Sequence, residues 1–227
     1  MTSEPRARFA RTAPVYDPRA RHLRVWSQAL GVFAERLKKA GASGAAIAGD
    51  LLDAETMYAA KALLAGQGSS LLEGRQTGLN YDVSSLAAVN FNSTIAGIEN
   101  ADVVLLVGSN PRWEAPLVNT RLRKAARKGA KVFAIGPEVD LGMRLSWIGN
   151  DLKLIGKLPK EVADAFAGAE RPAVIVGAGV LAAGALGAAL SLVSSLNLVR
   201  DGWNGFNVLH TSASRMASLI LGYTQKG

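Results

Sequence analysis

The most regular pattern of hydrophobic and polar positions lies between residues 101 and 136. A largely β-branched apolar run at Val103–Val107 predicts a buried strand, and the turn-forming residues Gly108–Pro111 follow it directly. From Glu114 the apolar spacing becomes helical, and residues 132–135 predict the next strand. Such a βαβ unit places its strand-to-helix turn at the carboxyl edge of a parallel sheet, where α/β proteins bind ligands. The sequence therefore predicts the frame of a cofactor site.

The helix of this unit is expected to have one apolar face and one basic face. Its apolar positions are Leu117, Leu122 and either Ala125 or Ala126, at the spacing of an amphipathic helix. The opposite face carries five basic residues: Arg121, Arg123, Lys124, Arg127 and Lys128.

Other segments continue the alternation of helices and strands. Before the βαβ unit, the pattern predicts a helix at 26–40 with Leu30, Phe33 and Leu37 facing inward, a strand at 45–48, a helix that is N-capped by Asp53 and runs to about 65, and a loop at 66–93. After the unit, it predicts a helix at 160–166, a strand at 173–176, an Ala-rich helix at 180–196 and a helix at 214–221. Alternating strands and helices predict an α/β fold, doubly wound around a mainly parallel sheet.

The stretch 172–199 carries no charge and is long enough to span a bilayer. It opens as a β-type run, however, and several glycines interrupt it. A buried strand followed by a buried helix fits this pattern better, so we expect no direct membrane span.

The length of 227 residues and the hydrophobic content of 49% suit one α/β domain with appendages. We expect that domain at residues 26–227, after a basic extended arm at 1–25. Residues 1–24 hold six arginines and two acidic residues. Six minus two gives this segment a charge of +4, which is half of the net charge of +8 of the whole chain. The arm could be an organelle-targeting sequence or part of a nucleic-acid-binding surface, given a pI near 10.0. An extension lying over neighbouring subunits is the interpretation we favour.

The turn at Gly108–Pro111, followed by Glu114 and Pro116, resembles the cofactor-binding segment of the molybdopterin oxidoreductase superfamily. The longer run Phe91–Lys124 resembles one branch of it, the large iron-sulfur subunit of respiratory complex I, which is the 75 kDa subunit of the mitochondrial enzyme and the G subunit of the bacterial NADH-quinone oxidoreductase. Four further segments match this branch in the same order: Ile47–Lys61, Ile148–Phe166, Arg171–Gly179 and Asp201–Met216. The resemblance covers most of the chain from Ile47 onward, and only the molybdopterin-oxidoreductase-like, C-terminal part of that large subunit.

The chain contains no cysteine and two histidines, His22 and His210. Iron-sulfur clusters need thiolate ligands, so this chain cannot hold one alone. The resemblance implies that the clusters and FMN lie on partner subunits. The cluster-bearing N-terminal counterpart would then be a separate polypeptide or would have been removed.

In active members of the superfamily a Cys, selenocysteine or Ser ligates molybdenum near the first crossover, which corresponds here to residues 72–78. Thr77 would stand near the ligand position, and its hydroxyl is a poor metal ligand. Many complex I relatives have a Cys where Gly74 stands. We therefore expect no catalytic, cofactor-binding or metal-binding residues, but a vestigial frame: Gly108, Ser109, Asn110, Pro111 and Thr77.

Three weaker signals have structural interpretations. Gly177-Ala178-Gly179 hints at a dinucleotide site, but Gly184 is too far along for the usual glycine spacing, which favours a packing turn. Trp203 and Phe206 are expected to pack, and His210 is expected to form a structural hydrogen bond.

Together these features predict a non-catalytic structural subunit of the hydrophilic arm of respiratory NADH:ubiquinone oxidoreductase, with no active site of its own. Its expected partners are other subunits of that arm, not nucleic acid. The expected location is the matrix side of the mitochondrial inner membrane or the cytoplasmic side of a bacterial one. The alternatives are a fragment of a molybdopterin-dependent oxidoreductase and a basic nucleic-acid-binding module.

Overall fold

The computed structural model describes residues 21–75, 79, 81 and 83–224, with side chains from Trp26 onward. These residues form two compact units. The first contains the described residues up to Ala45 together with Ala62–Leu71, and the second contains Ala46–Lys61 together with the described residues from Leu72 onward.

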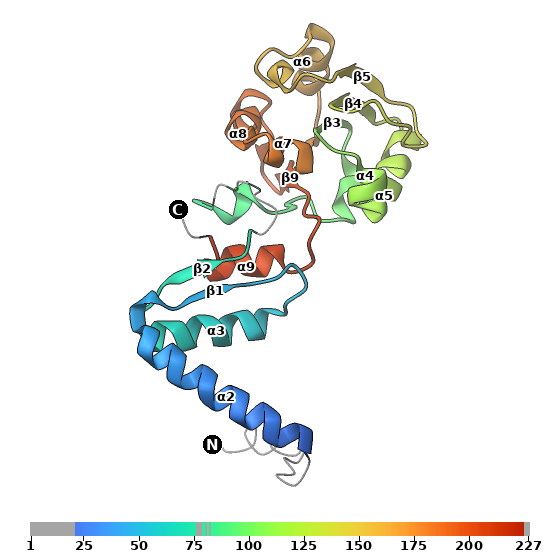
Figure 1. Ribbon diagram of the computed structural model, residues 1–227. Helices are drawn as coiled ribbons and strands as arrows, with labels where there is room; N and C mark the ends of the chain where they lie inside the picture. Colours follow the sequence, from blue (N-terminus) through green and yellow to red (C-terminus); the bar gives the residue numbers. More distant parts are fainter. Residues whose placement is uncertain (1–20, 76–78, 80, 82, 225–227) are drawn as a thin grey trace, which may run out of the picture. The chain divides into compact units, whose positions relative to one another are not determined.

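The second unit is built on a five-stranded sheet in the order β5-β4-β3-β6-β9, in which every neighbouring pair is parallel (Figure 1). The strands are β3 (Val103–Val107), β4 (Lys131–Ile135), β5 (Ser146–Gly149), β6 (Pro172–Val176) and β9 (Phe206–Val208). From β3 the chain moves outward to β4 and β5, and it then returns to the other side of β3 with β6 and β9. The direction of winding therefore reverses between β3 and β6.

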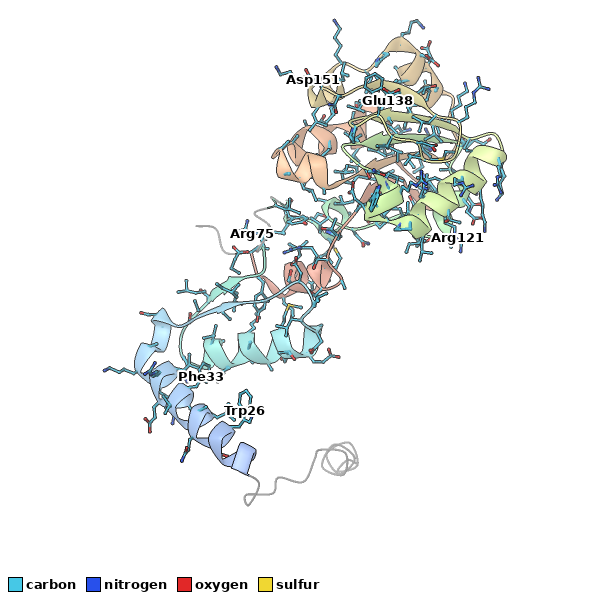
Figure 2. All side chains as sticks on the ribbon, turned by 45° about the vertical axis from the view of Figure 1, so that its right-hand side comes forward. Trp26, Phe33, Arg75, Arg121, Glu138 and Asp151 are labelled. Atoms are coloured by element: carbon cyan, nitrogen blue, oxygen red, sulfur yellow. The ribbon has the colours of Figure 1, made fainter. Side chains whose placement is uncertain are left out.

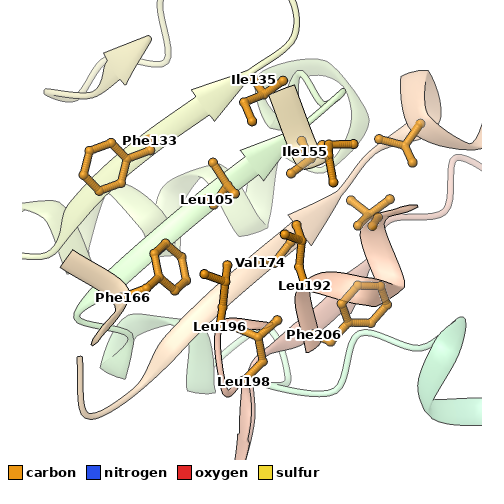
Figure 3. Close-up of a cluster of buried hydrophobic side chains, with 14 of the residues drawn as sticks. Leu105, Phe133, Ile135, Ile155, Phe166, Val174, Leu192, Leu196, Leu198 and Phe206 are labelled. Atoms are coloured by element: carbon orange, nitrogen blue, oxygen red, sulfur yellow. The ribbon is translucent and has the colours of Figure 1, made fainter. Parts of the chain in front are cut away.

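Both faces of the sheet are covered, because successive side chains of β3 enter two different hydrophobic clusters. Leu105 packs with helices α6 (Lys160–Ala167), α7 (Ala178–Ala182) and α8 (Leu186–Ser195), and Figure 3 shows this cluster. Leu106 packs on the opposite face with helix α5 (Pro116–Arg127). Burial on both faces explains why the strand has a continuous apolar sequence rather than an alternating one. The doubly wound, mainly parallel α/β fold is confirmed.

The chain contains further helices and strands outside this sheet. They include helix α4 (Pro111–Glu114), the 3₁₀ helices η2 (Leu86–Ala88), η3 (Gly97–Asn100) and η4 (Leu152–Gly156), the short antiparallel pair β7 (Val199–Arg200) and β8 (Trp203–Asn204), the two-stranded sheet of β1 (Ala45–Ile47) and β2 (Leu71–Glu73), and helices α3 (Ala54–Gly66) and α9 (Arg215–Leu221).

The first turn of α3 is fixed by Asp53, as the sequence predicts. Its carboxylate accepts the Thr56 N–H at 2.7 Å and the Thr56 hydroxyl at 2.9 Å. These bonds lower the pKa of Asp53, the backbone bond contributing most. Within the second unit, Tyr223 ties the C-terminal segment to α3, because its hydroxyl donates to the Met57 carbonyl at 2.6 Å.

The first unit contains helix α2 (Arg21–Ala40) and the 3₁₀ helix η1 (Gly41–Ser43). The helix begins at Arg21, five residues before the expected start at Trp26. The inward orientation expected for Leu30 and Phe33 is wrong, since both are more than half exposed, and Trp26 is exposed as well (Figure 2). An amphipathic spacing predicts a helix, but it does not predict which other element, if any, packs against the apolar face of that helix.

Two further expectations are corrected. The single helix expected at 180–196 is broken into α7 and α8, because Gly184 adopts a φ of +64° that ends the helical path. Leu117 is 69% exposed instead of packing beside the fully buried Leu122, because the buried face of α5 is formed by Val118, Leu122 and Ala125 and Leu117 lies off that face.

Among the helices in the described part of the chain, none combines the length and the apolar character that crossing a bilayer needs.

Replacing Leu122 by alanine should destabilise the second unit strongly, by about 2–5 kcal/mol, because the cavity would lie between α5 and the sheet. Leu117→Ala on the same helix is the matched control and should change stability by less than about 0.5 kcal/mol. Urea unfolding followed by circular dichroism measures both. Equal losses would contradict the burial of Leu122 between α5 and the sheet.

Replacing Asp102 by alanine should cost about 1–2 kcal/mol, because its carboxylate accepts the N–H groups of Glu170 at 2.5 Å and Arg171 at 3.1 Å ahead of β6. The exposed Asp201 provides the control, since Asp201→Ala removes the same charge from a turn. The measurement is again urea unfolding, and an Asp102→Ala protein as stable as Asp201→Ala would contradict the assignment.

Candidate functional site

The candidate site lies where the sheet reverses its direction of winding. The turn after β3, Gly108–Pro111, and the turn after β6, Gly177–Gly179, stand at the carboxyl ends of neighbouring parallel strands. Open α/β sheets bind ligands at such switch points. The structure therefore brings together two glycine-containing segments that are about seventy residues apart in the sequence.

The two turns are in direct backbone contact. The Gly179 N–H donates to the Gly108 carbonyl at 2.9 Å. A β-carbon added at Gly177 would lie 2.4 Å from the β-carbon of Ser109, and one added at Gly108, whose φ is +56°, would lie 2.8 Å from the Val180 nitrogen. Glycine is required at both positions by this close approach. The packing-turn interpretation of Gly177–Gly179 is confirmed.

Glu114 joins the two turns from the end of α4. One carboxylate oxygen accepts the Asn110 N–H at 2.6 Å, and the other accepts the Ala178 N–H at 2.9 Å. Ala178 is the first residue of α7, so a negative charge lies at the N-terminal end of that helix. The sequence places Glu114 at the start of the helical pattern and within the resemblance, and it predicts no hydrogen bond for the carboxylate. The four-residue spacing from Asn110 is the one signal that could have indicated its role.

The other residues of the predicted frame are placed as follows. Pro111 is the first residue of α4, where a missing N–H costs nothing. Ser109 is buried, and neither its hydroxyl nor the side-chain oxygen of Asn110 has a hydrogen-bond partner among the described residues. Thr77 lies outside the described residues.

Position 74 is tightly packed. A β-carbon at Gly74 would lie 3.0 Å from that of Ser218 and 3.2 Å from that of Tyr223, and the Gly74 N–H donates to the Tyr223 carbonyl. A cysteine side chain could enter only if these neighbours moved.

Beside Gly74 lies a buried polar cluster. Arg215, with 2% of its surface exposed, donates to the Gly74 carbonyl and to the Asp50 carboxylate at 2.7 Å. Its guanidinium carbon lies 5.7 Å from the ring centroid of Tyr81, and that ring lies 5.5 Å from the ring of His210. Burial raises the pKa of Tyr81. The guanidinium of Arg215 is thus bonded to groups of the protein itself.

His210 forms the structural hydrogen bond that the sequence predicts. Its Nε2 lies 2.5 Å from the Val89 carbonyl, so this nitrogen carries the proton, and Nδ1 has no partner among the described residues. Burial lowers the pKa of His210, and the positive charge of Arg215 adds to this effect. The packing predicted for Trp203 and Phe206 is also confirmed: the indole N–H donates to the Pro172 carbonyl at 2.8 Å, and Phe206 is buried in the core.

A cavity of about 260 Å³ lies beside Ser109, over the carboxyl ends of β3 and β4. Its lining includes Leu106, Ala134, Met143 and Trp147. Small-molecule sites usually enclose about 300–1,000 Å³, so this space is small for a pterin dinucleotide.

The residues at the switch point do not fit the molybdopterin group that the fold family implies. The two turns touch, and the amide groups that would meet a diphosphate are bonded to Glu114. Within the described ranges no group of three or more His, Asp or Glu side chains is arranged to hold a metal ion.

Lowering the pH should destabilise the folded chain through His210. Its folded pKa is below its unfolded value near 6.5, so the unfolded state binds the proton more readily, and stability present above pH 6.5 is lost as the pH falls. Between pH 7.5 and 5.5, wild type should lose more stability than His210→Gln, by at most about 1.4 kcal/mol per pH unit. Urea unfolding at each pH tests this, and parallel profiles would contradict it.

The family model of the molybdopterin oxidoreductases matches residues 24–227. Among curated relatives, the G subunit of the NADH-quinone oxidoreductase of Rickettsia felis is 37% identical over 207 residues, covering 87% of this chain and 31% of the relative. The mitochondrial NADH-ubiquinone oxidoreductase 78 kDa subunit of Candida albicans is 35% identical, covering 87% of this chain and 29% of the relative. The mitochondrial NADH dehydrogenase [ubiquinone] iron-sulfur protein 1 of Solanum tuberosum is also 35% identical, with coverage of 87% and 28%.

This chain thus spans less than a third of the length of the curated relatives that it matches. The resemblance to the large-subunit branch of complex I is confirmed by these relatives. With a family model that matches nearly its whole length and a parallel sheet of the expected topology, the chain belongs to the molybdopterin oxidoreductase family.

Proposed function

We propose that this chain is a non-catalytic structural part of the hydrophilic arm of respiratory NADH:ubiquinone oxidoreductase. The observation that carries the proposal is its 34–37% identity, over 87% of its length, to relatives named as the G subunit of the NADH-quinone oxidoreductase. The closed switch point supports the non-catalytic role, because Glu114 bonds the amides that a cofactor would use.

The electron carriers of such a complex would lie on partner subunits. A chain with no cysteine supplies no thiolate for an iron-sulfur cluster, and we assign no flavin or molybdenum cofactor to it. The expected partners are the other subunits of the hydrophilic arm, including a cluster-bearing N-terminal counterpart.

The proposed location is supported by the same relatives. Two have mitochondrial names and others are bacterial, so we propose the matrix side of the mitochondrial inner membrane or the cytoplasmic side of a bacterial one.

The two rival functions have less support. A molybdenum oxidoreductase would need an open switch point, whereas here the turns are in contact. Nucleic-acid binding would use the basic face of α5, yet Arg121 and Lys124 on that helix and Lys128 at its C-cap all pair with Glu99. Arg121 and Lys124 lower the pKa of Glu99, Arg121 contributing most. Part of the positive charge is thus already neutralised within the fold.

Affinity purification of the tagged full chain from mild-detergent extracts of its own source tests the proposal. Mass spectrometry should find flavin-bearing and cluster-bearing subunits, and metal analysis should find iron without molybdenum. The matched control is an extract of cells that carry the untagged chain. Recovery of the chain alone with molybdenum would overturn the proposal, and saturable, salt-sensitive binding to DNA or RNA would favour the nucleic-acid alternative.

A further inference from the structure

We propose that the carboxylate of Glu114 acts as an intramolecular anion in this fold. This carboxylate takes the place that a ligand phosphate would occupy at the switch point of the sheet. The domain is therefore closed to phosphate-bearing cofactors at this point. The inference concerns the second unit alone and does not depend on the partners proposed above.

The first argument is the identity of the two donors. Asn110 precedes α4 as its N-cap and Ala178 opens α7, so both N–H groups belong to helix starts, whose amides lack partners within the helix. Amides of this kind bind phosphates in α/β proteins. Here each is bonded to a different oxygen of one carboxylate, at 2.6 and 2.9 Å.

The second argument is the charge of Glu114. No lysine or arginine among the described residues forms an ion pair with it, so its negative charge is balanced by backbone dipoles. A phosphate entering the same place would meet a like charge at bonding distance. It would have to displace a group that already makes two charge-assisted hydrogen bonds.

The third argument is how the chain positions this side chain. α4 ends at Glu114, and Ala115 leaves the helical region with φ −152° and ψ 73° before α5 begins. The break separates Glu114 from α5 and lets its carboxylate reach back over the turn that follows β3. Because it also holds the start of α7, Glu114 joins the two halves of the doubly wound sheet.

Thermal unfolding of the full chain tests this assignment. Glu114→Ala should lower Tm by about 3–10 °C, and Glu114→Gln by less, because the amide oxygen of glutamine can still accept one N–H. The matched control is Glu138→Gln, which removes the same charge from an exposed loop at the same end of the sheet. A Glu114→Ala protein with the Tm of this control would overturn the proposal.

Two further measurements make the test specific. Formate should raise the Tm of Glu114→Ala more than that of wild type, relative to the same concentration of chloride, because it restores a carboxylate. Ala178→Pro removes one donor at a position where proline is tolerated, so Glu114→Gln should cost less in that background. Equal formate effects and strictly additive Tm shifts would both contradict the proposal.

A ligand assay completes the design, and it remains informative if Glu114→Ala fails to fold. Wild type should show no saturable rise in Tm with pyrophosphate. A saturable rise in wild type that becomes larger in the Glu114→Gln protein, where the like charge is gone, would show that the switch point is open to phosphates and would overturn the inference.

Discussion

Strand β3 is the element on which the rest of the second unit depends. Its five residues are all buried, and it is bonded along both edges, to β4 and to β6, in continuous parallel register. Its side chains feed the hydrophobic clusters on both faces of the sheet, so every covering helix packs against it directly or through a neighbour. Because the winding reverses at its edge, the same strand also determines where the candidate site lies.

The geometry at that edge shows how a fold can keep the frame of a site without the room for a ligand. Glycine at 108 and 177 allows close backbone approach, which in cofactor-binding relatives of this architecture serves the ligand. In this chain the same freedom brings one turn onto the other, and Glu114 accepts the amides of Asn110 and Ala178. These two amides are thus bonded within the protein, while the buried Ser109 hydroxyl and the Asn110 side-chain oxygen have no hydrogen-bond partner among the described residues.

The spacing of apolar residues and the turn-forming residues predict those helices and strands whose positions depend on neighbouring residues in the sequence. The unit from Val103 to Ile135 and the cap at Asp53 are encoded by short-range apolar spacing and turn residues, and they were predicted. The partners of α2, the exposure of Leu117 and the three-residue strand β9 depend on what lies beside them in space. The role of Glu114 was missed for the same reason, because one of its two donors, Ala178, is 64 residues away.

The packing around Gly74 also constrains how this sequence can change. A side chain at position 74 would press on Ser218 and on Tyr223, whose hydroxyl holds the C-terminal segment against α3. A side chain there requires a shift on the other side of the contact. Substitutions at positions 74 and 218 are therefore expected to be epistatic, because any side chain at 74 must displace the neighbouring helix α9, which carries Ser218.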